Sequence, residues 1–163
     1  MATPTYDLLD STTLGTSAAS VTFSSISQDY RDLVVVISGT GTGSFQNVKI
    51  RFNGSTADYS WVNMSGDGSS PTSTTGSGDS WISLNNKAYL NATNGTWIAH
   101  VFDYAQTDKH KTVLARGNNA SAGTDAIANR WGNTAAITTV GIFEQGVGDF
   151  ATGTSFYLFG ISA

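Results

Sequence analysis

The sequence contains no cysteine, and this absence excludes several kinds of chemistry at once. A chain without cysteine can form no disulfide framework, no thiolate zinc site, no iron–sulfur cluster and no cysteine nucleophile. Charge is also scarce, because Asp, Glu, Lys and Arg make up only 12 % of the residues, and the net charge is −4. Nucleic-acid binding depends on clustered Lys and Arg. The eight basic residues are scattered along the chain, so nucleic acid is not an expected partner.

Long apolar runs and helix-forming residues are few as well. No run approaches the roughly 20 apolar residues of a membrane-spanning helix, and Met1–Pro4 lacks the basic and apolar parts of a signal peptide. We therefore expect no membrane association. Glu144 is the single glutamate, whereas Ser and Thr together supply 42 residues and Val, Ile and aromatic residues are frequent. This composition favours β-strands over helices.

Apolar and polar residues alternate in short segments bounded by turn residues. The segment 48–52 alternates in this way and stops at Asn53-Gly54, a dipeptide typical of tight hairpin turns. The run 33–37 is apolar throughout, which predicts a strand buried on both faces. Similar patterns predict strands at 4–14, 19–24, 57–63, 80–84, 97–104, 111–116, 135–143 and 154–161. The sequence therefore predicts an all-β fold, a single jelly-roll-like antiparallel β-sandwich over residues 1–163 with about eight to ten short strands.

Three segments carry separate expectations. Residues 65–79 (SGDGSSPTSTTGSGD) are too polar to bury anything, and we interpret them as a flexible loop, with an exposed contact loop as the alternative. Residues 124–129 are the one place where we consider a helical turn. Residues 1–14 predict an edge strand, or an arm that reaches a neighbouring subunit, because Pro4 cannot donate a hydrogen bond within a central strand.

Candidate catalytic residues are few. His100 lies in a predicted strand and His110 in a polar turn, and no Gly-x-Ser-x-Gly sequence is present to hold a serine nucleophile. Asp103 and Glu144 could in principle flank a glycosidic bond, but we interpret them as surface carboxylates at strand ends. We therefore predict no enzymatic activity, no catalytic residue and no cofactor.

Metal and phosphate sites are not predicted either. Asp67 and Asp79 could hold Ca²⁺ together with nearby carbonyl groups, but the chain has neither an EF-hand loop nor a His-Glu-x-x-His sequence. The glycine-rich segment 39–43 lacks the lysine of a phosphate-binding loop, and no helical pattern follows it. We interpret this segment as a hairpin loop.

Aromatic residues give two further sets of candidates. Exposed tryptophans could stack on sugar rings, although most tryptophans fill a core or a subunit interface; the candidates are Trp61, Trp81, Trp97 and Trp131. Near the end of the chain, four consecutive apolar residues place apolar side chains on both faces of one strand. One face would fill the core and the other would contact another subunit, which predicts a homo-oligomer, with a trimer favoured. The subunit-interface candidates are Phe156, Tyr157, Leu158 and Phe159.

Four segments in this order carry a family resemblance: TYDLLDSTTLGTSAASVTFSSISQDYRDLVVVISG, VKIRFNGSTADYS, RWGNTAAITTVGIF and FATGTSFYLFGISA. Together they resemble short virion proteins of tailed bacteriophages. The resemblance implies a structural virion component that has no catalytic residues and forms a homotrimer. Such proteins look like capsid decoration (cement) proteins, which bind the major capsid protein on the capsid exterior. Related β-domains end tail-fibre proteins, so the alternative is a tail-associated receptor-binding or carbohydrate-binding module whose partner is a host surface glycan.

Overall fold

The computed structural model describes residues 5–162, and over this range the chain forms strands and turns without a helix. The described part therefore has no helix that could cross a membrane. The strands are β1 (Tyr6–Thr13), β2 (Ser20–Phe23), β3 (Asp32–Gly39), β4 (Asn47–Phe52), β5 (Tyr59–Gly66), β6 (Pro71–Asp79), β7 (Ile82–Ser83), β8 (Gly95–Val101), β9 (Lys111–Asn119), β10 (Gly123–Trp131), β11 (Val140–Gln145) and β12 (Ser155–Ile161).

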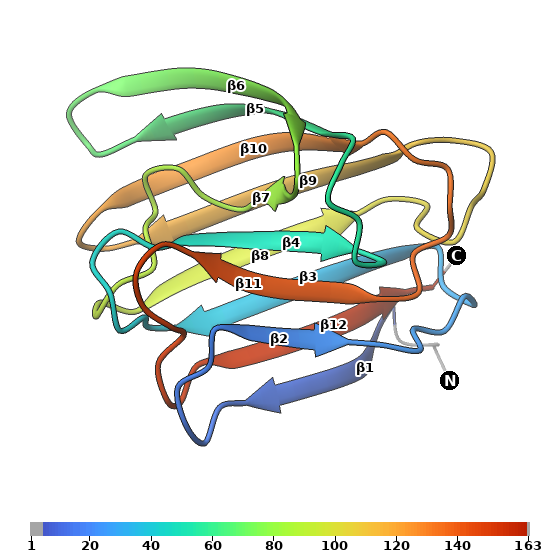
Figure 1. The fold of residues 1–163 in the computed structure, drawn as a ribbon, viewed down its shortest axis with the longest axis horizontal. Helices are drawn as coiled ribbons and strands as arrows, with labels where there is room; N and C mark the ends of the chain where they lie inside the picture. Colours follow the sequence, from blue (N-terminus) through green and yellow to red (C-terminus); the bar gives the residue numbers. More distant parts are fainter. Residues whose placement is uncertain (1–4, 163) are drawn as a thin grey trace.

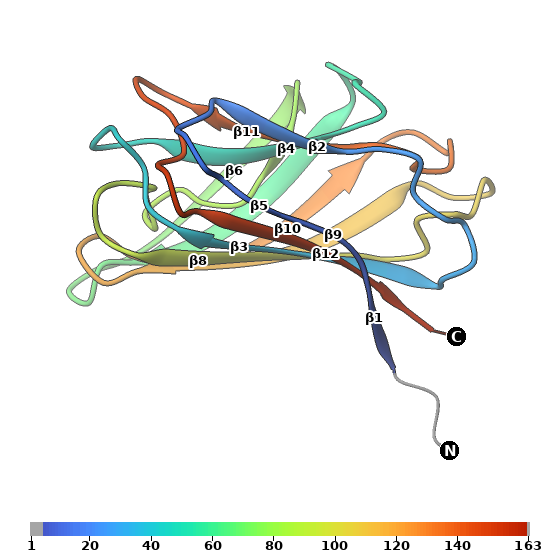
Figure 2. The same cartoon turned by 90° about the horizontal axis from the view of Figure 1, so that it is seen from below.

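The strands form two antiparallel sheets that pack as a sandwich (Figure 1). The large sheet has eight strands in the order β1-β12-β3-β8-β9-β10-β5-β6, and the small sheet has four in the order β2-β11-β4-β7. Figure 2 shows the two layers from the side, with the small sheet covering one face of the large sheet. The predicted β-sandwich is confirmed, with twelve strands in the described residues in place of the expected eight to ten.

The core lies between the two sheets and is built by strict alternation along the strands. In β9 and β10 every second residue is buried and the intervening ones are exposed, as a strand with one covered face requires. The run 33–37 lies in β3, between β12 and β8, and all of it except the partly exposed Val36 is buried. Phe52, Tyr59 and Trp131 form an aromatic cluster in which Tyr59 and Trp131 stack with ring centroids 6.0 Å apart.

The segment between β7 and β8 covers part of the inner side of the large sheet, and its polar groups are satisfied by side chains of the sheet. The Asp125 carboxylate accepts hydrogen bonds from the backbone N–H groups of Asn86, Lys87 and Ala88 at 2.8, 2.8 and 2.7 Å. Asn119 donates to the carbonyl oxygens of Tyr89 and Thr93. These bonds fix a strand-free segment against the sheet, since buried backbone polar groups need partners.

Two expectations for polar segments are wrong. Most of the segment 65–79, expected to be a loop, forms the end of β5 and the whole of β6, and only a short turn joins them. The reason is that an edge strand gains its hydrogen bonds from its neighbour and needs no apolar face, so polarity alone does not exclude it. Residues 124–129, considered as a helical turn, lie in β10, where β9 and β5 pair with them on either side.

Both edge strands of the large sheet carry an irregularity. In β1 the register with β12 shifts between Leu8 and Asp10, and in the β5–β6 pair it shifts between Tyr59 and Ser60, opposite Gly78. Because β1 is the first strand in the order of the large sheet, the edge strand predicted within residues 1–14 is present. Pro4, on which that prediction rested, lies outside the described residues.

Candidate functional site

One face of the large sheet is turned away from the small sheet; we call it the outward face and define it on the strands β12, β3, β8, β9, β10 and β5. Residues that oppose each other in the strand register point to the same side. The register therefore arranges the middle of the outward face in rows across these six strands. The first row is Tyr157, Val36, Ile98, Arg116, Ala126 and Met64, the second is Phe159, Val34, His100, Leu114, Ala128 and Val62, and the third is Ser155, Ser38, Thr96, Asn118, Thr124 and Gly66.

The first two rows are mainly apolar, and their side chains are partly open to solvent. Leu114, Val62 and Met64 expose 50, 54 and 65 % of their surface, which is unusual for neighbouring apolar residues on a sheet. At the other end of the rows, Tyr157 and Phe159 stack with ring centroids 6.3 Å apart. The outward face is therefore an apolar strip that crosses six strands.

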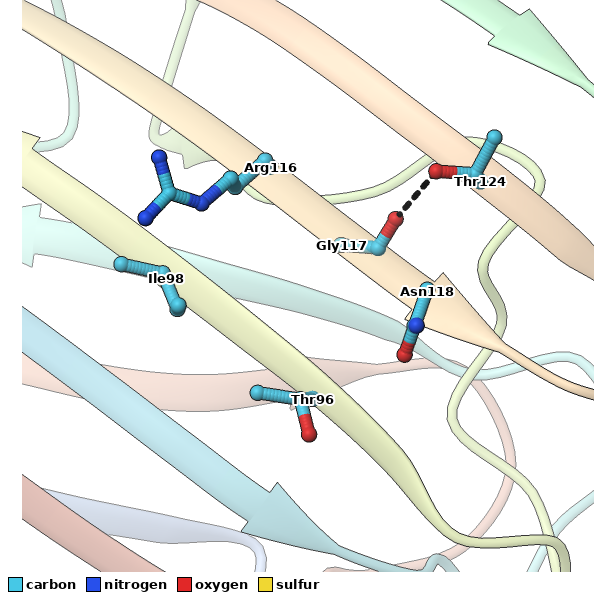
Figure 3. Close-up of a pocket in the computed structure, with 6 residues that line it drawn as sticks. All are labelled: Thr96, Ile98, Arg116, Gly117, Asn118 and Thr124. Atoms are coloured by element: carbon cyan, nitrogen blue, oxygen red, sulfur yellow. Dashed lines mark hydrogen bonds between the residues drawn. The ribbon is translucent and has the colours of Figure 1, made fainter.

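The third row is polar and uncharged. Its residues Thr96, Asn118 and Thr124, together with Ile98 and Arg116, line a depression of about 210 Å³. Figure 3 shows how these side chains lie. The hydroxyl of Thr124 donates to the carbonyl oxygen of Gly117 at 3.1 Å. Hydroxyl and amide groups thus border the apolar strip on one side.

Arg116 is the charged residue at the centre of the outward face. It is exposed, and within residues 5–162 its guanidinium makes neither a hydrogen bond nor an ion pair with another side chain. It borders both the polar depression and a second, apolar depression of about 370 Å³ lined by Val62, Met64 and Leu114. Arg130, further along β10, is already engaged, because it donates to Nδ1 of His110.

Asp32 is the acidic residue at an outward position of these six strands, and its carboxylate is buried. Its oxygens accept hydrogen bonds from the backbone N–H of Asp103 at 2.9 Å and from Nε of Arg31 at 3.0 Å, and Nε2 of His100 lies 3.2 Å away. Burial by itself would raise the pKa of Asp32, but these hydrogen bonds outweigh burial, and the pKa lies below its ordinary value. Asp32 is 2 % exposed and therefore presents no negative charge on the surface.

The structure divides the four subunit-interface candidates between the two faces of β12. Phe156 and Leu158 fill the core, and the Phe156 ring packs edge-on against Phe150 with centroids 4.9 Å apart. Tyr157 and Phe159 point outward at the end of the apolar rows. Two of the four residues are therefore placed where a second subunit could contact them.

The four tryptophans do not form one platform. Trp97 and Trp131 are fully buried, and the indole N–H of Trp97 donates to the carbonyl oxygen of Ala88 at 2.8 Å. Trp61 is partly buried and donates to the Asp79 carboxylate. Trp81 is partly exposed and packs edge-on against Phe143.

The carboxylates considered for catalysis lie at opposite ends of the sandwich. Asp103 follows β8, whereas Glu144 is near the end of β11, and these two strand ends point in opposite directions in Figure 1. Asp103 contacts Lys109 at 3.3 Å, and Glu144 accepts from the Gln46 amide at 2.9 Å. Asp67, considered for Ca²⁺, closes the β5–β6 turn by accepting from Ser69 and Ser70. No group of three or more potential metal ligands occurs in the part of the chain that the structure describes.

The outward face could not be predicted from the sequence. The alternation of Leu114 and Arg116 with buried residues is visible in the sequence, but the strand order that places them beside Ile98 and Met64 is not. One sequence feature did indicate such a face: Val62 and Leu114 are apolar residues at positions that the alternating pattern of their strands places on the exposed side. Only the register shows that these residues are neighbours.

No family model and no curated protein sequence matches this chain. Among solved structures, the galectin LEC-6 of Caenorhabditis elegans aligns over 100 % of this chain and 99 % of its own length, with 7 % identity and a TM-score of 0.35. A variant of the alginate lyase Aly36B in complex with an alginate trisaccharide aligns over 93 % of this chain and 78 % of its own, with 10 % identity and a TM-score of 0.39. Alignments at this level carry no argument about what this chain binds.

Proposed function

We propose that this protein is a structural component of a bacteriophage virion, and that it decorates the capsid exterior by binding the major capsid protein. The observation that carries the proposal is the outward face, a broad apolar strip with a polar border on a rigid sheet. Stable protein interfaces combine an apolar centre with a polar rim, and Met and Arg are enriched in them. The four sequence segments that resemble phage virion proteins support the assignment to a virion.

The shape of the surface supports binding to a protein rather than turnover of a small molecule. The depressions on the outward face are open and lie over flat sheet, whereas small-molecule sites are concave pockets that bury most of the ligand. Low charge also suits a protein present in many copies side by side, because neighbouring copies repel each other little. A homotrimer, in which Tyr157 and Phe159 would contact a neighbouring copy, remains part of the proposal.

The test is the copy number in purified virions, measured by quantitative mass spectrometry relative to the major capsid protein. A decoration protein gives a ratio near one, or a fixed large fraction of one, because it follows the shell lattice. A few tens of copies or fewer would place the protein in the tail. Absence from virions would overturn both locations.

A second candidate function, glycan binding at the tail, is favoured by one observation on the small sheet. Trp81, Phe143 and Arg51 lie together there, with the Arg51 guanidinium 4.4 Å from the centre of the Phe143 ring. An open depression of about 440 Å³ adjoins Arg51 and Phe143, and Gly141 contributes no side chain to it. Under this alternative, Trp81→Ala abolishes binding on a glycan array, whereas replacing the buried Trp97 by Phe leaves specificity unchanged.

A further inference from the structure

We propose that the outward face binds an acidic patch within an aliphatic surface of the partner protein, and that Arg116 pairs with a partner carboxylate at the centre of the contact. This inference rests on the proposed function, in which the partner is the shell protein. It adds the face that docks, the residue at its centre and the chemistry that the partner must present.

The apolar part of the face fits protein side chains. Val62 and Met64 come from β5 and Leu114 comes from β9, on either side of β10. All three are aliphatic, and each exposes half or more of its surface. Contiguous exposed apolar side chains of this kind mark interaction surfaces. Sugar rings stack on flat aromatic side chains, and Tyr157 and Phe159 lie at one end of these rows, away from Arg116. The third ring, that of His100, is already stacked on Phe102 with centroids 4.0 Å apart.

The charge of the face determines what the partner must carry. Arg116 lies between Ile98 and Ala126 in its row, so covering the apolar rows also covers the guanidinium. A buried guanidinium without a partner is strongly unfavourable. The outward positions of the six strands offer it no carboxylate of their own, because Asp32 is buried and already engaged. The partner therefore has to supply the negative charge.

A second copy seated face to face does not meet this requirement. A two-fold contact brings the same patch together from both subunits, so two guanidinium groups would be buried with no accessible carboxylate between them.

The polar border of the outward face also favours a partner that carries a carboxylate. Thr96, Asn118 and Thr124 can exchange neutral hydrogen bonds at the rim, which leaves Arg116 as the charged residue that selects the partner.

The experiment measures binding of the purified full-length protein to shells that lack it, by cosedimentation over a range of concentrations. The variants are Arg116→Glu, Arg116→Gln and Leu114→Asp, all at exposed positions, and thermal unfolding confirms that each one folds. Lys109→Glu is the control, since it makes the same charge change in the turn that follows β8, away from the face. We expect Arg116→Glu and Leu114→Asp to weaken binding at least about tenfold and the control to change it less than about twofold. We also expect Arg116→Gln to reduce the salt dependence of binding.

Four results overturn the inference. If the wild type binds shells and the variants at Arg116 and Leu114 bind equally well, the proposed function stands and the docking face is wrong. If Arg116→Glu lowers the native mass of the free protein, the occupant of the face is a second copy. If the wild type binds polygalacturonate, used as an acidic polysaccharide probe, in an Arg116-dependent way while shell binding does not depend on Arg116, the face is a carbohydrate site. Failure of the wild type to bind shells overturns the proposed function itself, and this partner with it.

Discussion

Lys49 and Ser83 are joined by a hydrogen bond in which the Nζ atom of Lys49 donates to the Ser83 hydroxyl at 2.8 Å. Lys49 is 6 % exposed, and no carboxylate in the described chain lies within ion-pair distance of its Nζ atom. Burial therefore lowers the pKa of Lys49 to about 8, although Asp79 and Asp125 act in the opposite direction.

This buried lysine predicts that the protein becomes more stable in mild alkali. Between pH 8 and the ordinary lysine value of 10.5, the unfolded chain holds a proton on Lys49 that the folded chain has lost. The free energy of unfolding should rise there by up to about 1.4 kcal/mol per pH unit from this group. Urea unfolding from pH 7 to 10.5 measures how the free energy of unfolding changes with pH. It should rise more steeply for the wild type than for Lys49→Met, whereas Lys109→Met, at an exposed position, should follow the wild type. Parallel profiles for the wild type and Lys49→Met would contradict the prediction.

Gly160 in β12 has no room for a side chain. A Cβ atom added there would lie 2.4 Å from Cγ of Tyr30, because the tyrosine ring packs flat on the backbone of the strand. Gly160→Ala should lower the free energy of unfolding by about 1–3 kcal/mol through overpacking. Gly15→Ala is the matched control, since nothing lies within 4 Å of its added Cβ atom. Combining Gly160→Ala with Tyr30→Ala should remove most of the extra cost, and an unchanged cost would exclude this contact as its cause.

The two buried tryptophans should differ in their response to replacement by phenylalanine. The indole N–H of Trp97 donates to the Ala88 carbonyl, whereas the indole N–H of Trp131 is buried without a partner in the described structure. Trp97→Phe loses a hydrogen bond, and Trp131→Phe relieves an unsatisfied polar group. Chemical denaturation should therefore show Trp97→Phe to be less stable than Trp131→Phe by about 1–3 kcal/mol. Equal losses would indicate that the indole N–H groups contribute alike.

Asp32 predicts part of the acid sensitivity of the fold. Its pKa in the folded protein lies below the ordinary value of 3.8, so its contribution is complete above that pH and is lost as the pH falls through the folded value. Asp32→Asn should be less stable than the wild type at neutral pH and should lose less stability between pH 4 and 2. Asp108→Asn, at an exposed turn position, should follow the wild-type profile. Thermal unfolding across this range measures both.

Much of the fold could be predicted because the local chemistry agrees with the final structure. The apolar run 33–37 predicted a strand, and it lies between β12 and β8 in the large sheet. The small sheet covers only one of its two faces, and Val36 on the outward face is partly exposed. The turn predicted at Asn53-Gly54 is present, with positive φ angles of 51° and 69° that suit these two residue types. In both cases neighbouring residues along the chain contain the information.

The rest depends on contacts between segments far apart in the sequence. Polarity concealed β6, because an edge strand with both faces exposed carries no apolar pattern. The outward face was not predicted for a related reason: Met64, Ala126 and Arg116 become neighbours only through the order β5-β10-β9. The alternation within each strand can be predicted from the sequence, but the identity of the neighbouring strand cannot.

The irregularities in β1 and β6 affect whether a strand of another chain can pair with the edges of the large sheet. Regular open sheet edges recruit further strands and allow a chain to polymerise, and β-bulges twist an edge so that such pairing fails. The large sheet carries its two register shifts in the strand pairs at its edges, where β1 meets β12 and β5 meets β6. Both edges of the large sheet are thereby poor templates for a further strand, which disfavours edge-to-edge pairing of copies into fibrils.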